Sequence, residues 1–418
     1  MTKALAQNLS ATVAQALKSY PEVAALHYES LAANERIGQA RSGYFPTLNL
    51  RGGDGYEYAD NPATRGRTGG DDELERTELS LTLRQNLFQG LGTRSSVESA
   101  QAGVLGAKWK ERGVSEEIAL KVTKAYLDVL QEERQIQLAK ENLKAHQGIL
   151  TLVQKRIKQN LSSRSEESQV LAKIKNVDAV ITRSEGALLD TQNNFVTLVG
   201  EQPESLNTPP LPTALSDDLE SAILIAQKNN ADVIKAQALV AQAKAEIQQR
   251  KSAFYPSVDL ELTGNLDRNL SGTPGRSESF STMLVMNMNL FAGGSDFYRV
   301  REAEFLLKRN QSNLERILRD VAEAVKEAHN AWMVAQSQHK TFASQVITNQ
   351  KVRKAYQQQY LLGKRTLLDL LDAENDLFIS RSNESREQNR TLFAAYRLLT
   401  AQGKLLESFG IASPSSLP

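Results

Sequence analysis

Cysteine is absent from this 418-residue chain, which excludes disulfide bridges, thiolate catalysis and metal sites built on cysteine. Histidine is scarce, and the four that occur lack the spacing of metal ligands. No run of 18 apolar residues exists, so the sequence predicts no transmembrane helix. Residues 1–20 also lack the apolar core of a signal peptide, as expected of an exported chain whose signal peptide has already been removed.

Aromatic residues amount to only 6%, and 50 Lys and Arg against 49 Asp and Glu leave a formal net charge of +1. A chain with so little net charge has no overall electrostatic field that would attract nucleic acid, so no nucleic-acid partner is predicted. Gly52-Gly53-Asp54-Gly55 precedes strand-like sequence rather than a helix, which excludes a phosphate-binding loop. The abundance of Ala, Gln, Leu, Glu and Lys is typical of long helices rather than of a compact α/β enzyme. The sequence therefore predicts no catalytic residues, no cofactor and no metal.

Alternation of apolar and polar residues with a period of two predicts two pairs of strands. The first pair covers about 45–58 and 76–88, around a polar Gly/Pro loop at 59–73, and the second covers about 256–267 and 279–290. Such hairpins suit either a small soluble sheet with packed apolar faces or a barrel wall with apolar side chains toward lipid and polar ones lining water. Because four strands cannot close a barrel and open edges are not tolerated in hydrocarbon, the barrel requires several copies of the chain.

Two very long helices are predicted, at about 93–158 and about 296–362. In the first, twelve positions between 118 and 157 step alternately by four and three, and ten of them are apolar. This seam indicates coiled-coil packing, and such a helix would extend roughly 100 Å at a rise of about 1.5 Å per residue. Shorter helical segments are predicted at 10–42, 166–199, 218–252 and 367–403.

The same order of elements occurs twice. Tyr44-Phe45-Pro46 is repeated by Phe254-Tyr255-Pro256 at an offset of 210 residues, and Leu87-Phe88-Gln89-Gly90 by Leu290-Phe291-Ala292-Gly293 at an offset of 203. The Ser/Pro tail from Ser413 is expected to be disordered. The predicted division is a first repeat at 1–200, a connector at 201–217, a second repeat at 218–403 and a C-terminal segment with its tail at 404–418.

The stretch 360–378 joins the second long helix to the helix that follows it. Gly363 is a helix-stop signal, and Thr366 is a suitable N-cap for the next helix. Asp369 and Asp372 are three residues apart, which places both carboxylates on one helix face, one turn apart. Two interpretations are open on spacing alone: the solvated edge of an amphipathic helix, or a functional acidic site.

These motifs resemble those of the TolC family of outer-membrane efflux and secretion channels. The resemblance covers essentially the whole chain, and its most specific part is Gly-x-Arg-Thr-x-x-Asp-x-x-Asp-Ala at 363–373. It implies a mainly α fold with a small β part, and a homotrimer whose twelve strands form an outer-membrane barrel. That barrel would continue as an α-helical barrel into the periplasm of a Gram-negative bacterium. The resemblance also implies that 201–217 and 404–418 form an equatorial belt, and that Pro46 and Pro256 lie at strand–helix swivels.

The resemblance also implies a gate. Asp369 and Asp372 match residues that form paired acidic rings at the closed periplasmic end of such channels, where they would act as gate and cation-binding site. Carboxylates from three chains at a narrow neck would repel one another, which is expected to raise their pKa values.

A latch is implied beside this gate. Tyr360 and Arg365 match family positions that tie the mobile inner helix pair to its neighbours, and the aligned first-repeat turn offers Ser165 and Glu166 as partners. Contact between Arg365 and Glu166, within one protomer or between two, is the predicted latch. The alternative is that Arg365 only caps a carbonyl near its own turn.

Periplasmic adaptor hairpins dock at the helix turns of such channels, which implies a docking role for six residues here. They are Asn160, Leu161, Ser162, Gly363, Lys364 and Thr366. The family usually has Gly where this chain has Asn160, which tolerates a left-handed backbone, so the turn is expected to survive while the adaptor's identity stays open. The other implied partners are an inner-membrane ABC or proton-driven transporter and outer-membrane lipid.

The implied function is a passive exit duct of a tripartite export system, which carries proteins of type I secretion, drugs or both. The stretch Ala11–Val23 resembles type I secretion members, which favours protein cargo. The alternative class is a soluble periplasmic coiled-coil scaffold or adaptor without a pore. An enzyme is not predicted, because no set of residues would form its site.

Overall fold

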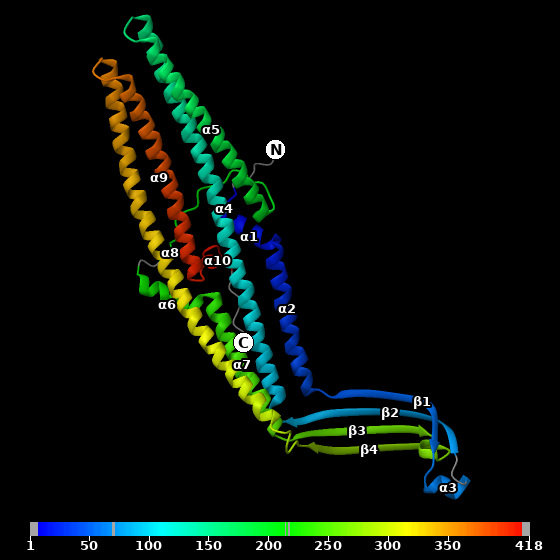
Figure 1. Cartoon of the computed structure of the whole chain (residues 1–418). Helices are drawn as coiled ribbons and strands as arrows, with labels where there is room; N and C mark the ends of the chain where they lie inside the picture. Colours follow the sequence, from blue (N-terminus) through cyan, green and yellow to red (C-terminus); the bar gives the residue numbers. More distant parts are fainter. Residues whose placement is uncertain (1–6, 69–71, 214, 216–217, 412–418) are drawn as a thin grey trace. The chain divides into compact units, whose positions relative to one another are not determined.

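The structure is a computed structural model that describes residues 7–68, 72–213, 215 and 218–411. It consists of helices and one four-stranded antiparallel sheet (Figure 1), which confirms the predicted mainly α fold with a small β part. No helix within these ranges combines the length and the apolar character of a membrane span. The first series of elements is α1 Leu9–Ser19, α2 Pro21–Arg41, β1 Thr47–Ala59, β2 Asp72–Gln89, α4 Gly92–Lys158 and α5 Arg164–Val199. The second is α6 Leu219–Asn229, α7 Ala231–Lys251, β3 Ser257–Arg268, β4 Arg276–Asn287, α8 Ser295–Leu361 and α9 Leu367–Ala401.

Short elements complete the chain, and a few bounds differ from the prediction. β2 begins four residues earlier than predicted, and β4 is shifted by three residues toward the N-terminus. β4 ends at Asn287 because that residue pairs with Ser257, the first residue of β3, so β3 offers no partner further along. The polar loop predicted at 59–73 contains a helix, and the predicted tail from Ser413 lies outside the described residues. The short elements are α3 Pro62–Thr68, α10 Leu405–Ser408 and the 3-10 turns η1 Ser42–Tyr44, η2 Ser252–Phe254 and η3 Leu270–Gly272.

Both hairpins begin in the same way. The turns η1 and η2 are followed by Phe45 and Tyr255, whose ψ angles of 156° and 153° are extended. A proline ring keeps the preceding residue out of the helical region, so Pro46 and Pro256 end the helical path, and each strand starts at the next residue. The two prolines therefore lie at helix–strand junctions, and their role as swivels stays a prediction.

The chain divides into two compact units, and each unit contains parts of both repeats. The sheet unit combines residues 29–107 and 235–315. The helical unit combines 108–234 and 316–411 with the described residues up to Tyr28. The units differ from the predicted repeats because equivalent stretches of the two repeats pack together.

The sheet unit orders its strands β1-β2-β3-β4, and within the described chain β1 and β4 each pair on one side only. Residues paired across strands share a face, so Leu48, Leu83 and Leu262 form one row of an apolar face. That face is uncovered in the protomer: Leu50 on β1 is 70% exposed and Leu284 on β4 is 67% exposed. The sheet therefore has two open edges and one bare apolar side.

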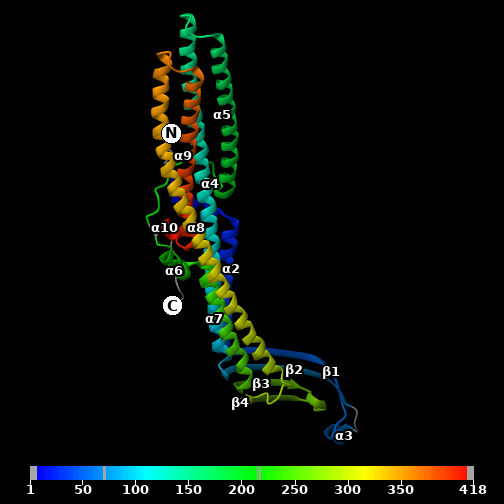
Figure 2. The same ribbon diagram turned by 60° about the vertical axis from the view of Figure 1, so that its left-hand side comes forward.

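In the helical unit, α5 lies along α4 and α9 lies along α8, as Figures 1 and 2 both show. Two buried tyrosines fasten the connector to these helices. The Tyr126 hydroxyl of α4 accepts the N–H of Asn207 at 2.9 Å, and the Tyr396 hydroxyl of α9 donates to the carbonyl of Pro210 at 3.2 Å. Burial raises the pKa of Tyr396 to about 12, so its hydroxyl remains a donor at neutral pH.

A buried ion pair in α4 fixes α10. The Arg112 and Glu116 side chains are 4% and 5% exposed, with 3.0 Å between Nη2 and Oε1. The Glu116 carboxylate also accepts the backbone N–H groups of Leu405 and Leu406, at 3.1 and 3.3 Å. Burial raises the pKa of Glu116, against the opposing effect of Arg112 and of these N–H groups. Both segments predicted to form the belt are thus tied to the helical unit where the structure describes them.

Candidate functional site

The turn between α8 and α9 is built as the sequence predicted. Gly363 has a φ of 73°, in the left-handed region, and its N–H donates to the carbonyl of Tyr360 at 3.1 Å. Thr366 is the N-cap of α9: its Oγ1 accepts the N–H of Asp369 at 3.2 Å, and the Asp369 carboxylate accepts the N–H of Thr366 at 3.1 Å. This capping box satisfies N–H groups at the start of α9 that the helix itself cannot bond.

The turn between α4 and α5 repeats this construction at an offset of 203 residues. Asn160 has a φ of 56°, which confirms that Asn accommodates the left-handed position. Ser163 is the N-cap, and Glu166 is the acid of the capping box. Because Ser163 caps it, α5 begins two residues before the predicted start, and Ser165 lies exposed in its first turn.

Asp369 and Asp372 have side chains 36% and 58% exposed, and each has a basic partner within the protomer. Arg365 Nη1 lies 3.7 Å from Asp369 Oδ1, and Lys173 Nζ of α5 lies 3.7 Å from Asp372 Oδ1. Hydrogen bonds from the hydroxyl and backbone N–H of Thr366 lower the pKa of Asp369. Within the protomer, the capping box and Arg365 thus favour the charged form of Asp369. The predicted rise concerns the carboxylates of three chains at the neck and stays a prediction.

Within the protomer, Arg365 does not contact Glu166, which corrects the intramolecular form of the predicted latch. The Arg365 guanidinium lies 4.3 Å from the ring centroid of Tyr356, and its Nε donates to Gln359 Oε1 at 3.1 Å. Glu166 is engaged with Ser163 in the capping box. A contact between Arg365 of one protomer and Glu166 of another stays a prediction.

Arg156, in the last turn of α4, joins the two turns, and the sequence pattern did not predict it. Its guanidinium lies 4.9 Å from the ring centroid of Tyr360, and Nη1 donates to the carbonyls of Tyr360 at 3.4 Å and Leu361 at 3.3 Å. On the other side, Nε donates to Ser162 Oγ at 3.3 Å and Nη2 donates to the carbonyl of Leu161 at 3.4 Å. The contact with Tyr360 spans 204 residues of sequence, so no local signal could have revealed it.

An apolar cluster from α4, α5, α8 and α9 lies beside these polar contacts. Tyr360 belongs to it and is 3% exposed, with its hydroxyl 3.5 Å from Ser162 Oγ. Leu368, which the sequence places next to the acid pair, is exposed instead. Tyr360 therefore connects the apolar cluster to Arg156 and to the first-repeat turn. The buried members are Ile149, Val153, Val170, Tyr360, Leu367, Leu370 and Leu371.

The six residues predicted to dock an adaptor all lie at these two turns. Leu161 is 60% exposed, and Leu362, directly after the end of α8, is 70% exposed. Lys364 is also exposed. Ser162 and Thr366 additionally take part in local hydrogen bonds, so their side chains serve the turns themselves.

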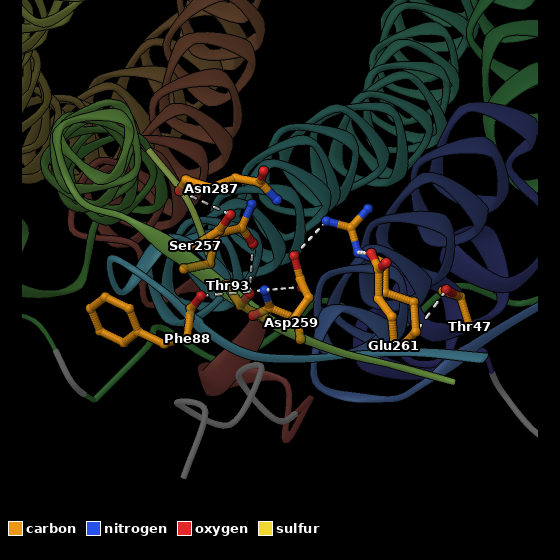
Figure 3. Close-up of polar contacts among 10 residues, drawn as sticks. Thr47, Phe88, Thr93, Ser257, Asp259, Glu261 and Asn287 are labelled. Atoms are coloured by element: carbon orange, nitrogen blue, oxygen red, sulfur yellow. Dashed lines mark hydrogen bonds and ion pairs between the residues drawn. The ribbon is translucent and has the colours of Figure 1, made fainter. Parts of the chain in front are cut away.

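The polar face of the sheet carries a second charged cluster, near the start of β3 (Figure 3). Arg84 of β2 donates to Asp259 at 2.5 Å and lies 3.6 Å from Glu261. Asn86 donates to the other oxygen of Asp259 at 2.8 Å, beside a bulge in β2 between Asn86 and Phe88. Asp259 is 1% exposed, and a carboxylate so buried needs these partners. Across the described chain, no group of three or more acidic or histidine side chains is arranged to hold a metal ion.

The sequence model of one family, described as outer membrane efflux protein, matches residues 12–201 and 222–404. These two ranges follow the two predicted repeats.

Relatives match over almost the whole chain. The outer membrane efflux protein BepC of Brucella suis is 21% identical over 403 residues, which cover 96% of this chain and 86% of that protein. The alkaline protease secretion protein AprF of Pseudomonas aeruginosa is 22% identical over 414 residues, which cover 96% and 84%. Among solved structures, the outer membrane protein VceC from Vibrio cholerae matches with a TM-score of 0.76 at 18% identity, over 94% of this chain and 96% of that chain. At this identity the structural match shows a shared fold.

Proposed function

This chain belongs to the outer membrane efflux protein family, and on that basis we propose that it is the exit duct of a tripartite export system. The duct lies in the outer membrane of a Gram-negative bacterium and extends into the periplasm. It conducts passively, because an inner-membrane transporter of ABC or proton-driven type supplies the energy. A periplasmic adaptor joins the transporter to the duct.

The observation that carries this proposal is the bare apolar side of the sheet with its two open edges. In water such a side would have to be covered, whereas in a bilayer it faces lipid. β3 and β4 have 12 residues each. At about 3.3 Å per residue and a tilt of about 45°, such strands would rise roughly 28 Å, close to the hydrocarbon thickness of a bilayer.

The open edges support a homotrimer. A strand edge in hydrocarbon leaves N–H and C=O groups without partners, so β1 of one protomer would pair with β4 of the next until the sheet closes. Three copies of four strands give a twelve-stranded barrel. Its polar face, with Arg84 and Glu261 among others, would line water.

The acid pair Asp369 and Asp372 would narrow the periplasmic mouth as a gate that binds cations. Within each protomer, the capping box and Arg365 favour the charged form of Asp369, and a charged carboxylate suits cation binding. Exposed apolar side chains at the same turns, such as Leu161 and Leu362, support docking of an adaptor there.

Protein cargo of the type I secretion class is favoured by the similarity to AprF, whose name describes secretion of a protease. Drug efflux is the other cargo class, and the similarity to BepC is compatible with it. Deletion of the gene, with secreted proteins and drug sensitivity compared side by side, separates the two: loss of a secreted protein at unchanged drug sensitivity indicates protein cargo.

We expect the native protein to require detergent for extraction, to have the mass of three chains by light scattering, and to conduct ions in planar bilayers. The physical reason is the bare apolar side, which needs lipid or detergent, and the open edges, which need neighbours. A water-soluble elongated dimer without conductance would instead identify the alternative, a coiled-coil scaffold without a pore.

A further inference from the structure

We infer that Arg156 is the positioning residue of the gate: it ties the α8–α9 turn to the α4–α5 turn of the same protomer and so holds the acidic start of α9 at rest. The inference rests on the proposed function, because it assigns the tie a part in keeping the duct closed.

One guanidinium spans both turns. Arginine presents five N–H donors in a planar fork, and here four hydrogen bonds divide evenly between the repeats. Two go to the first-repeat turn, at Leu161 and Ser162, and two go to the carbonyls of Tyr360 and Leu361. No other side chain described above bonds both turns at once.

The acceptors on α8 suit a cation. Tyr360 and Leu361 are the last residues of α8, where carbonyls lack helical partners and carry the negative end of the helix dipole. The Tyr360 ring adds a cation–π contact on its face. Tyr360 is 3% exposed and the hydrogen bond of its carbonyl to Arg156 is partly buried, whereas the hydrogen bonds of Arg156 to Leu161 and Leu361 are exposed to water. The partly buried contact is the stronger kind. The contact of Lys173 with the exposed Asp372, at 3.7 Å, is of the weaker surface kind.

The tie reaches the acid pair through a rigid turn. The carbonyl of Tyr360 accepts both Arg156 Nη1 and the N–H of Gly363. Two residues after Lys364, the capping box of Thr366 and Asp369 starts α9. Displacing Tyr360 would therefore move the start of α9 with it. The cap and the apolar cluster do not depend on Arg156, so its removal should release the turn without melting it.

The decisive comparison is Arg156→Gln with Arg164→Gln in planar bilayers. Arg164 is an exposed arginine in the first turn of α5, so its substitution makes the same change of charge near the same turn. We expect Arg156→Gln to raise the fraction of time spent open roughly fivefold, the shift that loss of about one net hydrogen-bond contribution produces. Arg164→Gln should behave as wild type. Trimers of Arg156→Gln that conduct as wild type would overturn the inference.

Two further variants separate a gating role from lost stability. Arg156→Lys keeps the charge but loses the planar fork of donors, so its conductance should lie between those of wild type and Arg156→Gln. If Arg156→Gln does not assemble, the Lys variant decides the question, since wild-type conductance of Arg156→Lys would overturn the inference. Phe195→Leu loosens the separate core around α1 and α5, where Phe195 is fully buried. It should lower the melting temperature without raising the open fraction, and a rise equal to that of Arg156→Gln would overturn the inference.

Hydrogen exchange distinguishes failure of the tie from failure of the proposed function. If wild type carries no current, the proposed duct is wrong. Faster amide exchange at the α8–α9 turn in Arg156→Gln than in Arg164→Gln would still support the tie. Equal exchange in the two variants would overturn it.

Discussion

Asp369 serves local structure and the proposed gate with one carboxylate. It accepts the N–H and hydroxyl of Thr366, and Arg365 lies 3.7 Å away. Glu166 has the same capping duty at the start of α5. Capping alone therefore accounts for an acid at this position, whereas Asp372 has no capping role and is the better single probe of the gate.

The cap makes a specific prediction about pH. The pKa of Asp369 in the folded chain is lowered from its ordinary value of 3.8, chiefly by the Thr366 hydroxyl. A lowered carboxyl pKa stabilises the fold above the unfolded pKa, and this contribution is lost as the pH falls through the folded pKa. We expect Asp369→Ala to lower the melting temperature at neutral pH, and the difference from wild type to shrink once the pH falls below 3.8.

Thermal unfolding in detergent, from neutral pH to strongly acidic conditions, measures this difference. Asp376→Ala is the matched control, since it removes an exposed carboxylate of α9 outside the cap. If the difference in melting temperature between wild type and Asp369→Ala stayed constant over the whole pH range, the carboxylate would not stabilise the fold through the cap.

At the level of elements, the two helix turns are alike because the same local rules act at both. Gly363 and Asn160 occupy the left-handed position, with φ of 73° and 56°. A Cβ placed on Gly363 would meet no atom within 4 Å, so space does not restrict this position and only the backbone conformation does.

We therefore expect Gly363→Asn to unfold at nearly the wild-type temperature, because the equivalent turn already uses Asn. Gly363→Val should be less stable by about 1–2 kcal/mol, the cost of a left-handed backbone for a β-branched residue, which lacks the local hydrogen bonding that lets Asn adopt it. Thermal or denaturant unfolding of the two variants tests this, with Asn160→Gly as a near-neutral control. Equal stability of Gly363→Val and Gly363→Asn would refute the assignment of a left-handed backbone to position 363.

Local signals predicted the two helix turns, the N-cap Thr366 and the strand faces, but not the N-cap Ser163 or the long-range contacts. Arg156 meets Tyr360 across 204 residues, and Arg84 meets Asp259 across 175 residues only because β2 of one hairpin pairs with β3 of the other. The helix α3 is different, since its signal was present: Asn61 precedes Pro62, an N-cap before a proline at the first helical position. The segment was nevertheless predicted as a loop, because the residues around this signal are rich in glycine.

At the scale of the whole molecule, the main feature is that the sheet of one protomer is incomplete by itself. Equivalent stretches of the two repeats pack into common units, and the resulting sheet has two open edges and a bare apolar side. A sheet in water turns such a side inward. A sheet that forms the wall of a membrane duct turns it outward and keeps its polar face wet.

The natural absence of cysteine allows this orientation to be measured directly with single-cysteine variants of the protein in lipid vesicles. We expect fluorophores on Leu50→Cys and Leu284→Cys to be quenched by a lipid-attached quencher. Asn49→Cys and Ser281→Cys, on the opposite face, should react with a water-soluble thiol reagent and escape quenching. The reverse pattern, or protein that stays outside the membrane with both apolar positions buried against protein, would contradict this orientation.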